Sequence, residues 1–195
     1  MLIAIEGIDG AGKTTIANFL AEELRKMGYD VVVFKEPSNS VYGKKIKFAD
    51  KRLSLEEEMD LFLKDRIEDV KNNIIPALKD GKIVIMDRYY YSNAAYQSAR
   101  GRLNALDILK MNEKIAPKPD LVLLLDLDVE VALKRLESRG KLSVFEDKEY
   151  LRKVRDVFLE IADERTVVVD ASKPLDALKK EVLKIVKSFL QAAPL

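Results

Sequence analysis

An eight-residue glycine-rich motif constrains the fold of this 195-residue chain more than any other feature. Residues 7–14 read Gly-Ile-Asp-Gly-Ala-Gly-Lys-Thr, directly after the apolar run Leu2–Glu6 and directly before an amphipathic stretch that begins at Lys13. The pattern G-x-x-x-x-G-K-[ST] between a strand and a helix is typical of a phosphate-binding loop, because successive backbone N–H groups converge there at a helix N-terminus. The motif therefore predicts a P-loop α/β fold with a nucleotide ligand.

Four further apolar runs, separated by amphipathic stretches, predict a parallel sheet built from βαβ units. They are rich in Val, Ile and Leu without strict alternation, as expected for strands buried on both faces. The expected strands are Leu2–Glu6, Val31–Lys35, Lys82–Met86, Leu121–Leu127 and Thr166–Val169. The expected helices cover residues 13–27, 54–79, 104–116, 128–139, 147–163 and 174–190. We expect a five-stranded parallel sheet with helices on both faces, in a three-layer α/β/α arrangement.

Local signals place several helix ends. Ser54 is followed three residues later by Glu57, a capping-box pattern. Gly28 and Gly81 stand where helix C-caps belong, and Pro117 stops the helix before the fourth strand. The chain shows no internal repeat, low-complexity segment or linker, so we expect residues 1–195 to form a single domain.

Composition excludes several kinds of chemistry. The chain has 34 Lys and Arg against 33 Asp and Glu, a formal net charge of +1, which argues against a dedicated nucleic-acid-binding protein. It has no Cys and no His, which excludes disulfides, thiolate metal sites and imidazole bases. No apolar stretch approaches the ~18 residues of a membrane span, and no signal peptide is visible. We therefore expect no membrane partner and a cytoplasmic location.

The motif and the third strand together predict an ATP and Mg²⁺ site. Lys13 is expected to reach the β- and γ-phosphates, and the Thr14 hydroxyl to ligate Mg²⁺. Asp87, at the carboxyl end of the third strand, is expected to hold Mg²⁺ through water, and Arg88 to neutralise phosphate charge. The alternative for Asp87 and Arg88 is an ordinary ion pair at the end of a strand. The residues expected around the ATP phosphates are Gly7, Ile8, Asp9, Gly10, Ala11, Gly12, Lys13, Thr14 and Thr15.

Phosphoryl transfer to a phosphate acceptor suits a chain without histidine. The acceptor oxygen is already anionic, so the reaction needs positioning and charge neutralisation rather than a general base.

Beyond the P-loop, the sequence resembles the thymidylate kinase family through essentially the whole chain. No segment is specific alone, but their order and spacing are typical of that family. The segments are residues 6–15, Glu36-Pro37, residues 61–66, Asp87-Arg88-Tyr89, residues 92–97, Arg135 with Arg139-Gly140, and Asp170-Ala171-Ser172.

The resemblance implies how an acceptor, dTMP, is recognised. Phe62 matches the phenylalanine that stacks on thymine, and Arg66, four residues on and hence on the same helical face, matches an arginine at the pyrimidine edge. From the residues alone, Phe62 is equally suited to the core and Arg66 to a solvated helix surface. Ser92 and Asn93 match polar residues near the thymine N3 edge, and Gln97, in the same segment, is also expected to bind the substrate.

The resemblance also assigns groups around the sugar and the acceptor phosphate. Arg88 matches the arginine that binds the acceptor monophosphate, and Tyr96 an aromatic near the sugar 2′ position. Asp9 matches an acid that contacts the 3′-hydroxyl or organises the acceptor. Tyr90 and Tyr91, on the same helix as Tyr96, are expected to be packing residues.

Two segments depart from the family pattern. Residues 139–148 resemble a lid over ATP, but Val144 stands where relatives with a glycine at position 10 carry an arginine. We expect Arg139 or Lys141 to supply the catalytic charge, and Arg135, one helical turn before Arg139, to face ATP; solvent-facing arginines are the alternative.

The second departure is the loop that follows the second strand, Glu36–Gly43, which lacks the usual phosphate-binding arginine. The available cations nearby are lysines. We expect Lys47 to hold the acceptor phosphate and the Tyr42 hydroxyl to assist.

Two other functions fit parts of the sequence. A deoxynucleoside kinase, or a kinase of another nucleoside monophosphate, would use the same scaffold, and for a neutral hydroxyl acceptor Glu36 is placed to act as base. Against the first, the third strand ends in Asp-Arg-Tyr rather than Glu-Arg-Ser. A P-loop switch is the second alternative, although the guanine-reading Asn-Lys-x-Asp is absent. The resemblance also implies a homodimer, with helices 54–79 and 104–116 as candidate faces; preference among dTMP, dUMP and other acceptors stays open.

Overall fold

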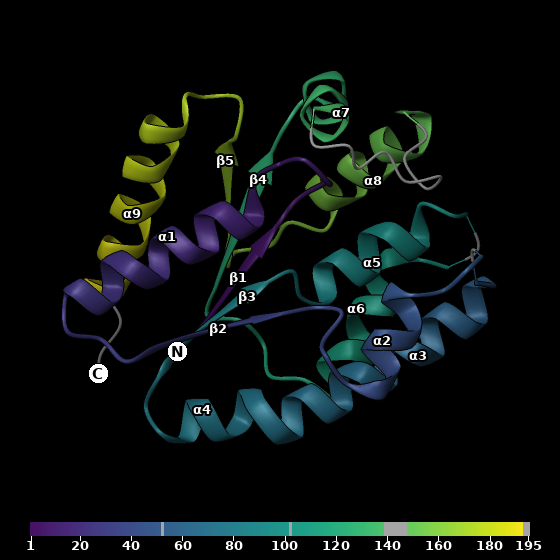
Figure 1. The fold of residues 1–195 in the computed structure, drawn as a ribbon, viewed down its shortest axis with the longest axis horizontal. Helices are drawn as coiled ribbons and strands as arrows, with labels where there is room; N and C mark the ends of the chain where they lie inside the picture. The colour runs from purple at the N-terminus through teal and green to yellow at the C-terminus, as the bar shows by residue number, and fades with distance from the viewer. Residues whose placement is uncertain (52, 102, 139–147, 193–195) are drawn as a thin grey trace.

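Five parallel strands form one sheet, as expected, and their order is β2-β3-β1-β4-β5 (Figure 1). The structure is a computed structural model that describes residues 1–51, 53–101, 103–138 and 148–192. The strands follow the apolar runs of the sequence, and every residue of β1 and β3 is buried. Their bounds are β1 Leu2–Glu6, β2 Val31–Lys35, β3 Ile83–Asp87, β4 Leu121–Asp126 and β5 Thr166–Asp170.

Helices cover both faces of the sheet, which completes the three layers. Figure 1 shows α1 and α9 side by side on one face, with α4, α5 and α8 on the other. One hydrophobic cluster joins the strands to both helical layers. The helices are α1 Lys13–Lys26, α2 Val41–Lys47, α3 Leu55–Asp69, α4 Ile75–Lys79, α5 Tyr90–Ser98, α6 Ala105–Glu113, α7 Val129–Glu137, α8 Lys148–Glu160 and α9 Leu175–Ala192.

The helix expected over residues 54–79 is present, but it contains a π-helical turn. α3 runs into the turn Val70–Ile74, which leads directly into α4. The predicted capping box is confirmed: the Ser54 hydroxyl accepts from the backbone N–H of Glu57, whose side chain accepts from the backbone of Ser54. The helix ends before Gly81, which has a φ of +77°.

The prediction of an irregular loop over residues 36–43 is wrong at its end, where α2 begins. The Ser40 hydroxyl caps α2 by accepting from the backbone N–H of Gly43. A Cβ on Gly43 would lie 2.2 Å from the Ser38 carbonyl oxygen and 2.8 Å from Asp65 Oδ1. Gly43 therefore permits close packing of α2 against α3 rather than breaking a helix.

The tyrosines at the start of α5 pack in the core, as expected for Tyr90 and Tyr91. Their side chains are buried, and their rings stack with centroids 5.0 Å apart. The neighbouring Tyr89 is also buried, and its hydroxyl donates to the Pro117 carbonyl. These contacts anchor α5, whose next turns carry the polar residues 92–97.

Strand register gathers functional groups at one edge of the sheet. Asp87, the last residue of β3, lies opposite Ile5 of β1 on one side and opposite Lys35 of β2 on the other. The segments that follow these strands are the P-loop, residues 36–40 and Arg88, so they meet at the carboxyl ends of adjacent parallel strands. In open α/β sheets this edge is where ligands bind.

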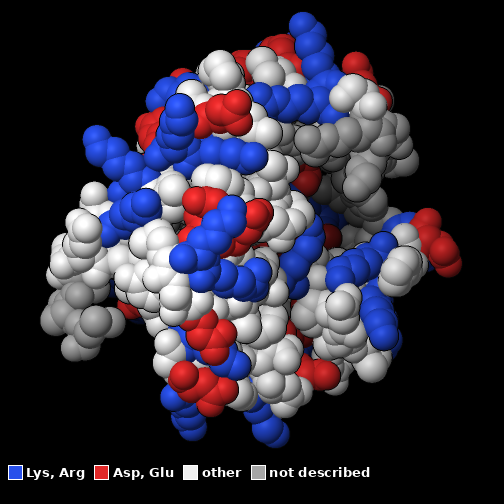
Figure 2. All heavy atoms as spheres, turned by 60° about the vertical axis from the view of Figure 1, so that its left-hand side comes forward, with Lys and Arg blue, Asp and Glu red and all other residues white. Residues whose placement is uncertain are grey.

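The surface carries charges of both signs. Figure 2 shows Lys and Arg intermixed with Asp and Glu over one face, in keeping with the near-zero net charge. Among the described residues, none of the helices is sufficiently long and apolar to span a bilayer.

Candidate active site

The P-loop leaves β1 and wraps around the start of α1. Gly10 has a φ of +84°, and a Cβ there would lie 2.7 Å from the Ala132 carbonyl oxygen of α7. Only glycine meets both conditions without displacing α7. The first turn of α1 has neither a capping side chain nor an acidic residue, so its backbone N–H groups are available to an anion.

Lys13 lies across the mouth of this loop. Its ammonium donates to the carbonyl oxygens of Gly7, at 2.8 Å, and Ile8, at 2.7 Å. Burial, helped by the nearby Arg88, lowers the pKa of Lys13 to about 7. A buried ammonium held only by neutral carbonyls is poorly compensated, so a phosphate anion in the loop would be a better partner than those carbonyls.

Thr14 and Asp87 meet as the sequence predicted for a metal pair. Thr14 Oγ1 donates to Asp87 Oδ2 at 2.5 Å, and Asp87 Oδ1 is buried without a hydrogen-bond partner. One hydroxyl and one carboxylate suit Mg²⁺, which prefers oxygen ligands and is often held by few protein groups together with substrate phosphates. No cluster of three or more acidic side chains that could hold a metal occurs among the described residues.

Lys35 also enters this pair, which the sequence analysis missed. Its ammonium lies 2.8 Å from Asp87 Oδ2 and 3.0 Å from Thr14 Oγ1, so a cation already touches both proposed metal ligands. The cause is the register of β2 on β3, which sets Lys35 directly opposite Asp87. Its position at a strand's carboxyl end was the available signal.

Arg88 and Asp9 form the next part of the site. Arg88 has a positive φ of 72°, a rare conformation for a non-glycine residue, which turns its side chain away from the strand line. Its guanidinium pairs with Asp9, donates to Ser92 Oγ at 3.3 Å and lies over the Tyr96 ring. Burial opposes the charge on Asp9, but Arg88 and Lys13 hold the pKa of Asp9 below its usual value.

Tyr96 completes this group by binding Asp9 twice. Its hydroxyl donates to Asp9 Oδ2 at 2.8 Å and accepts from the Asp9 backbone N–H at 3.0 Å. Asp9 therefore holds two residues, Arg88 and Tyr96, that the family resemblance predicted on the acceptor side.

Glu6 supports this arrangement from below. Its carboxylate accepts from the backbone N–H groups of Tyr89, at 2.8 Å, and Ser92, at 3.3 Å, and from the Ser92 hydroxyl at 2.5 Å. Complete burial raises the pKa of Glu6 to about 7. The sequence placed Glu6 at the end of the first strand and in the first family segment, residues 6–15, but predicted no role for it.

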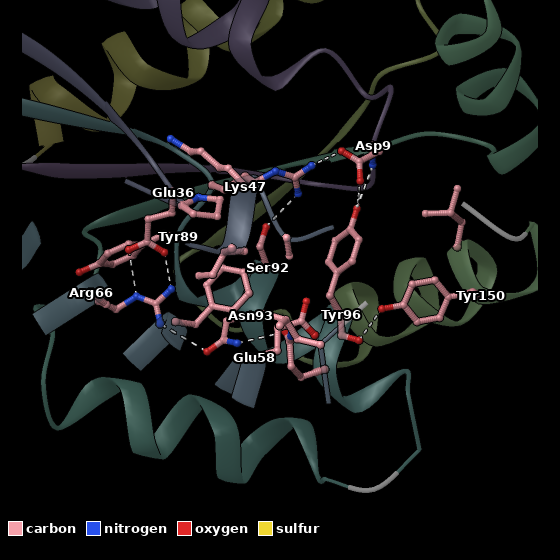
Figure 3. Close-up of a pocket in the computed structure, with 18 of the residues that line it drawn as sticks. Asp9, Glu36, Lys47, Glu58, Arg66, Tyr89, Ser92, Asn93, Tyr96 and Tyr150 are labelled. Carbon is pink, nitrogen blue, oxygen red and sulfur yellow. Dashed lines mark hydrogen bonds and ion pairs between the residues drawn. The ribbon is translucent and has the colours of Figure 1, made fainter. Parts of the chain in front are cut away.

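A cavity of about 530 Å³ opens between these residues and α3 (Figure 3). Its lining brings together most of the acceptor contacts predicted from sequence. Figure 3 shows Arg66 of α3 facing Asn93 of α5, with Asp9 of the P-loop at another part of the wall, and Phe62 and Arg88 also line the cavity. The predicted residues in its lining are Asp9, Lys47, Phe62, Arg66, Arg88, Ser92, Asn93, Tyr96 and Gln97.

Arg66 is fixed by a buried ion pair that the sequence did not reveal. Nε donates to Glu36 Oε1 at 2.9 Å, and Nη2 donates to Glu36 Oε2. Both side chains are almost completely buried. Because both carboxylate oxygens of Glu36 are taken by a guanidinium, Glu36 is poorly placed to act as a general base.

The two groups expected at the acceptor phosphate have different positions. Lys47 lines the cavity, with its ammonium on Asn39 Oδ1 at 3.0 Å, whereas Tyr42 is not among the described lining residues. Both residues lie on α2, and the segment that leads into α2 is held by Asp65, which accepts from the backbone N–H of Ser38 and from the hydroxyls of Ser38 and Ser40.

The ATP side is described in part. Arg135 donates to the carbonyl oxygens of Ala171 at 3.1 Å and Gly10 at 3.5 Å, so it lies beside the P-loop. Arg139 and Lys141, expected to supply catalytic charge, lie outside the described residues, as do Val144 and most of the predicted lid.

Several other residues of the cavity lining were not foreseen, among them Tyr150 and Glu58. Tyr150 of α8 donates to the Tyr96 carbonyl at 2.7 Å, and Glu58 of α3 pairs with Arg100. Glu58 lies four residues before Phe62 on the same helical face, which was a usable signal. For Tyr150, which reaches the site through the packing of α8 on α5, sequence offered none.

Comparison with known proteins agrees with this geometry. The sequence model of a family described as thymidylate kinase matches residues 5–182. A probable thymidylate kinase of Archaeoglobus fulgidus is 64% identical over 190 residues, covering 97% of this chain and 96% of that protein. A probable thymidylate kinase of Pyrococcus horikoshii is 42% identical (96% of each chain), and a thymidylate kinase of Xylella fastidiosa is 41% identical (98% of this chain, 92% of that protein).

Proposed function

The chain belongs to the thymidylate kinase family, and from that premise we propose that it transfers the γ-phosphoryl group of ATP to dTMP, giving dTDP. The observation that carries the proposal is the continuity of one cavity. An aromatic ring and amide groups line its inner end, and the Asp9–Arg88 pair stands where it approaches the P-loop. A planar base and a phosphate on one small molecule would fit those two ends.

The donor is proposed to bind at the P-loop. Its phosphates would take the N–H groups at the start of α1 and draw Lys13 away from the carbonyls of Gly7 and Ile8. Arg135, beside Gly10, is proposed to lie along the nucleotide. Thr14 and Asp87 would hold Mg²⁺, which when bound neutralises negative charge on the phosphates.

The acceptor is proposed to bind with its base between Phe62 and the amides of α5. Ser92, Asn93 and Gln97 line this part of the cavity together with Arg66. The Arg88 guanidinium would exchange its weak contact with Ser92 for the acceptor phosphate while keeping Asp9. Tyr96, held by Asp9, would pack against the sugar. Lys47, on an exposed helix end, and Tyr42 are proposed to approach the same phosphate.

The transfer itself requires charge neutralisation. The acceptor phosphate oxygen attacks the γ-phosphorus, the bond from phosphorus to the bridging oxygen breaks, and ADP leaves. Lys13 and Arg88 flank the space between the two sites, and Arg88 keeps its charge because Asp9 raises its pKa despite burial. Arg139 and Lys141, from outside the described residues, are proposed to add cationic charge there.

A side-by-side assay tests the reaction. We expect the purified chain with ATP and Mg²⁺ to phosphorylate dTMP and not thymidine, because Glu36, the base expected for a neutral hydroxyl acceptor, is engaged with Arg66. Turnover of thymidine alone would refute the proposal. Lys13→Met should lower kcat by at least about a hundredfold, since it removes phosphate neutralisation; Lys44→Met, an exposed lysine of α2, is the control.

The remaining expectations concern the whole chain. We propose that it is one domain, since one sheet and one hydrophobic cluster contain the described core, and that it works in the cytoplasm, where both substrates are metabolites. We also propose a homodimer, supported by apolar side chains exposed on α3 and α6, namely Ile67, Leu106 and Met111.

A further inference from the structure

A buried asparagine outside the cavity touches two of the residues that line it. Asn112 of α6 has no exposed surface and is absent from the described lining of the cavity. Its Oδ1 accepts from Arg66 Nη1, and its Nδ2 donates to Asn93 Oδ1 at 3.1 Å. The same Nδ2 donates to the carbonyl oxygen of Ile108, one turn earlier in α6, at 2.8 Å.

The two ends of the Asn112 amide cannot be exchanged. A guanidinium only donates hydrogen bonds, so the group facing Arg66 must be the amide oxygen. A backbone carbonyl only accepts, so the group facing Ile108 must be the amide nitrogen. Asn112 is therefore oriented from both sides, independently of any ligand.

This orientation passes to Asn93. Because Asn112 presents an N–H to it, the side-chain oxygen of Asn93 must face Asn112 and Arg66. The Asn93 amide nitrogen then points the other way, where it donates to Gln97 Oε1 at 3.1 Å. Among the described contacts, the side-chain amide of Gln97 has no partner that fixes which end is oxygen and which is nitrogen. It can therefore turn to present its oxygen to Asn93.

The weakest contact in this network lies at the cavity. Arg66 Nη1 and Asn93 Oδ1 are 3.4 Å apart, longer than the other bonds between side-chain nitrogen and oxygen atoms in the network. Figure 3 shows this pair at the cavity wall, with Arg66 held on its other side by Glu36. A ligand that displaces the long contact would meet a donor on Arg66 next to an acceptor on Asn93.

We propose that Asn112 is a positioning residue for substrate specificity, because it fixes the orientation of the Asn93 amide. The fixed amide favours a base in which a C=O group lies next to a ring N–H. It disfavours a base in which an amino group lies next to an unprotonated ring nitrogen. The inference rests on the proposed function. A 4-oxo pyrimidine such as thymine or uracil presents the first pattern, and cytosine presents the reverse.

The test compares substrates in Asn112→Asp, which is nearly isosteric. Aspartate still accepts from Arg66 but cannot donate to Asn93, so the Asn93 amide turns and presents its nitrogen at the cavity. The ratio of kcat/KM for dTMP to that for dCMP should fall by about tenfold or more, mainly through KM for dTMP. Asn112→Ala, which leaves the Asn93 side-chain oxygen with only its long contact to Arg66, should lower the same ratio and serves as the test if Asn112→Asp does not fold.

The control is Ile108→Val on the same helix, which trims a buried side chain without touching the hydrogen bonds. It should lower stability slightly and leave the ratio unchanged. An unchanged ratio in the folded Asn112 variants, or an equal change in Ile108→Val, would overturn the inference. Wild-type protein that ignores dTMP would instead overturn the proposed function, and N3-methylated dTMP, which lacks the N–H, should bind wild type about tenfold more weakly than dTMP.

Discussion

Charged residues at the carboxyl edge of the sheet are buried more deeply than their chemistry favours, and each is compensated by particular neighbours. Asp9 forms an ion pair with Arg88, Asp87 with Lys35, and Glu36 with Arg66. Glu6 is the exception, because hydrogen bonds from neutral groups are its direct partners. It is the carboxylate for which burial raises the pKa to about 7.

Glu6 should therefore make stability depend on pH. Between its ordinary value of 4.5 and about 7, the folded protein holds a proton on Glu6 that the unfolded chain has released. The contribution of Glu6 to the free energy of unfolding is fully present below pH 4.5. It falls by ~3 kcal/mol in all as the pH rises to about 7. Glu6→Gln, which stays neutral and still accepts from Tyr89, should flatten this slope in urea unfolding at pH 5, 6, 7 and 8.

The control for that slope is Glu56→Gln, an exposed carboxylate in the first turn of α3. It should reproduce the wild-type pH dependence. If Glu6→Gln did so too, the burial argument for Glu6 would be wrong.

Lys35 should compete with Mg²⁺ in the ligand-free protein. Its ammonium contacts both Thr14 and Asp87, so Lys35→Met should tighten Mg²⁺ binding about two- to fivefold in calorimetry without nucleotide, a modest gain because the lysine is half exposed. Asp87→Asn should abolish that binding, and Lys44→Met should not alter it. Weaker binding in Lys35→Met would show that the lysine assists the metal rather than displacing it.

At the scale of elements, local capping decides where helices begin, but packing decides which short helices exist. The capping box at Ser54 was readable because it involves four consecutive residues. The short α2 was not, since its glycine is explained only by the close approach of Ser38 and Asp65. The same kind of close approach ties the P-loop to α7 at Gly10.

Replacing Gly10 should separate backbone strain from steric clash. Gly10 and Gly28 have similar positive φ values, 84° and 90°, but a Cβ on Gly28 meets nothing within 4 Å. Gly28→Ala should cost about 1–2 kcal/mol of unfolding free energy, from strain alone. Gly10→Ala should cost roughly 1–3 kcal/mol more, from contact with Ala132, and should raise KM for ATP. Equal losses in urea unfolding would contradict a rigid contact between the loop and α7.

For the whole molecule, the order of strands brings the P-loop after β1, Arg88 after β3 and residues 36–40 after β2 to the same edge of the sheet. The chain reaches the acceptor cavity from α3, α5 and α8, which are far apart in sequence. The remaining apolar surface on α3 and α6 is where we propose that a second copy binds.

Dimerisation should respond to charge on that surface. Ile67→Glu and Leu106→Glu, at side chains about half exposed, should give monomers in sedimentation equilibrium, because a carboxylate would be desolvated at the interface. The wild-type melting temperature should rise with protein concentration. Leu175→Glu, an exposed leucine at the start of α9, should remain dimeric like wild type. Monomeric wild-type protein at micromolar concentration would refute the dimer.

Sequence alone determined the fold class and the P-loop, because these depend on short-range patterns, whereas resemblance to a known family predicted about half of the residues that line the cavity. Apolar runs mark the strands, the glycine motif marks the loop, and helical spacing puts Phe62 and Arg66 on one face. These signals survive in a linear reading since the interacting groups lie within one or two turns of each other.

Only the tertiary structure decided which charged and polar groups are partners. Lys35 meets Asp87 through the register of two strands, Glu36 meets Arg66 across the cavity wall, and Asn112 reaches Arg66 from a separate helix. Each pair is separated by 30 to 52 positions. A buried polar or charged group without a partner lowers the stability of the fold, so each of these groups needs one. A single sequence does not reveal which distant residue is that partner.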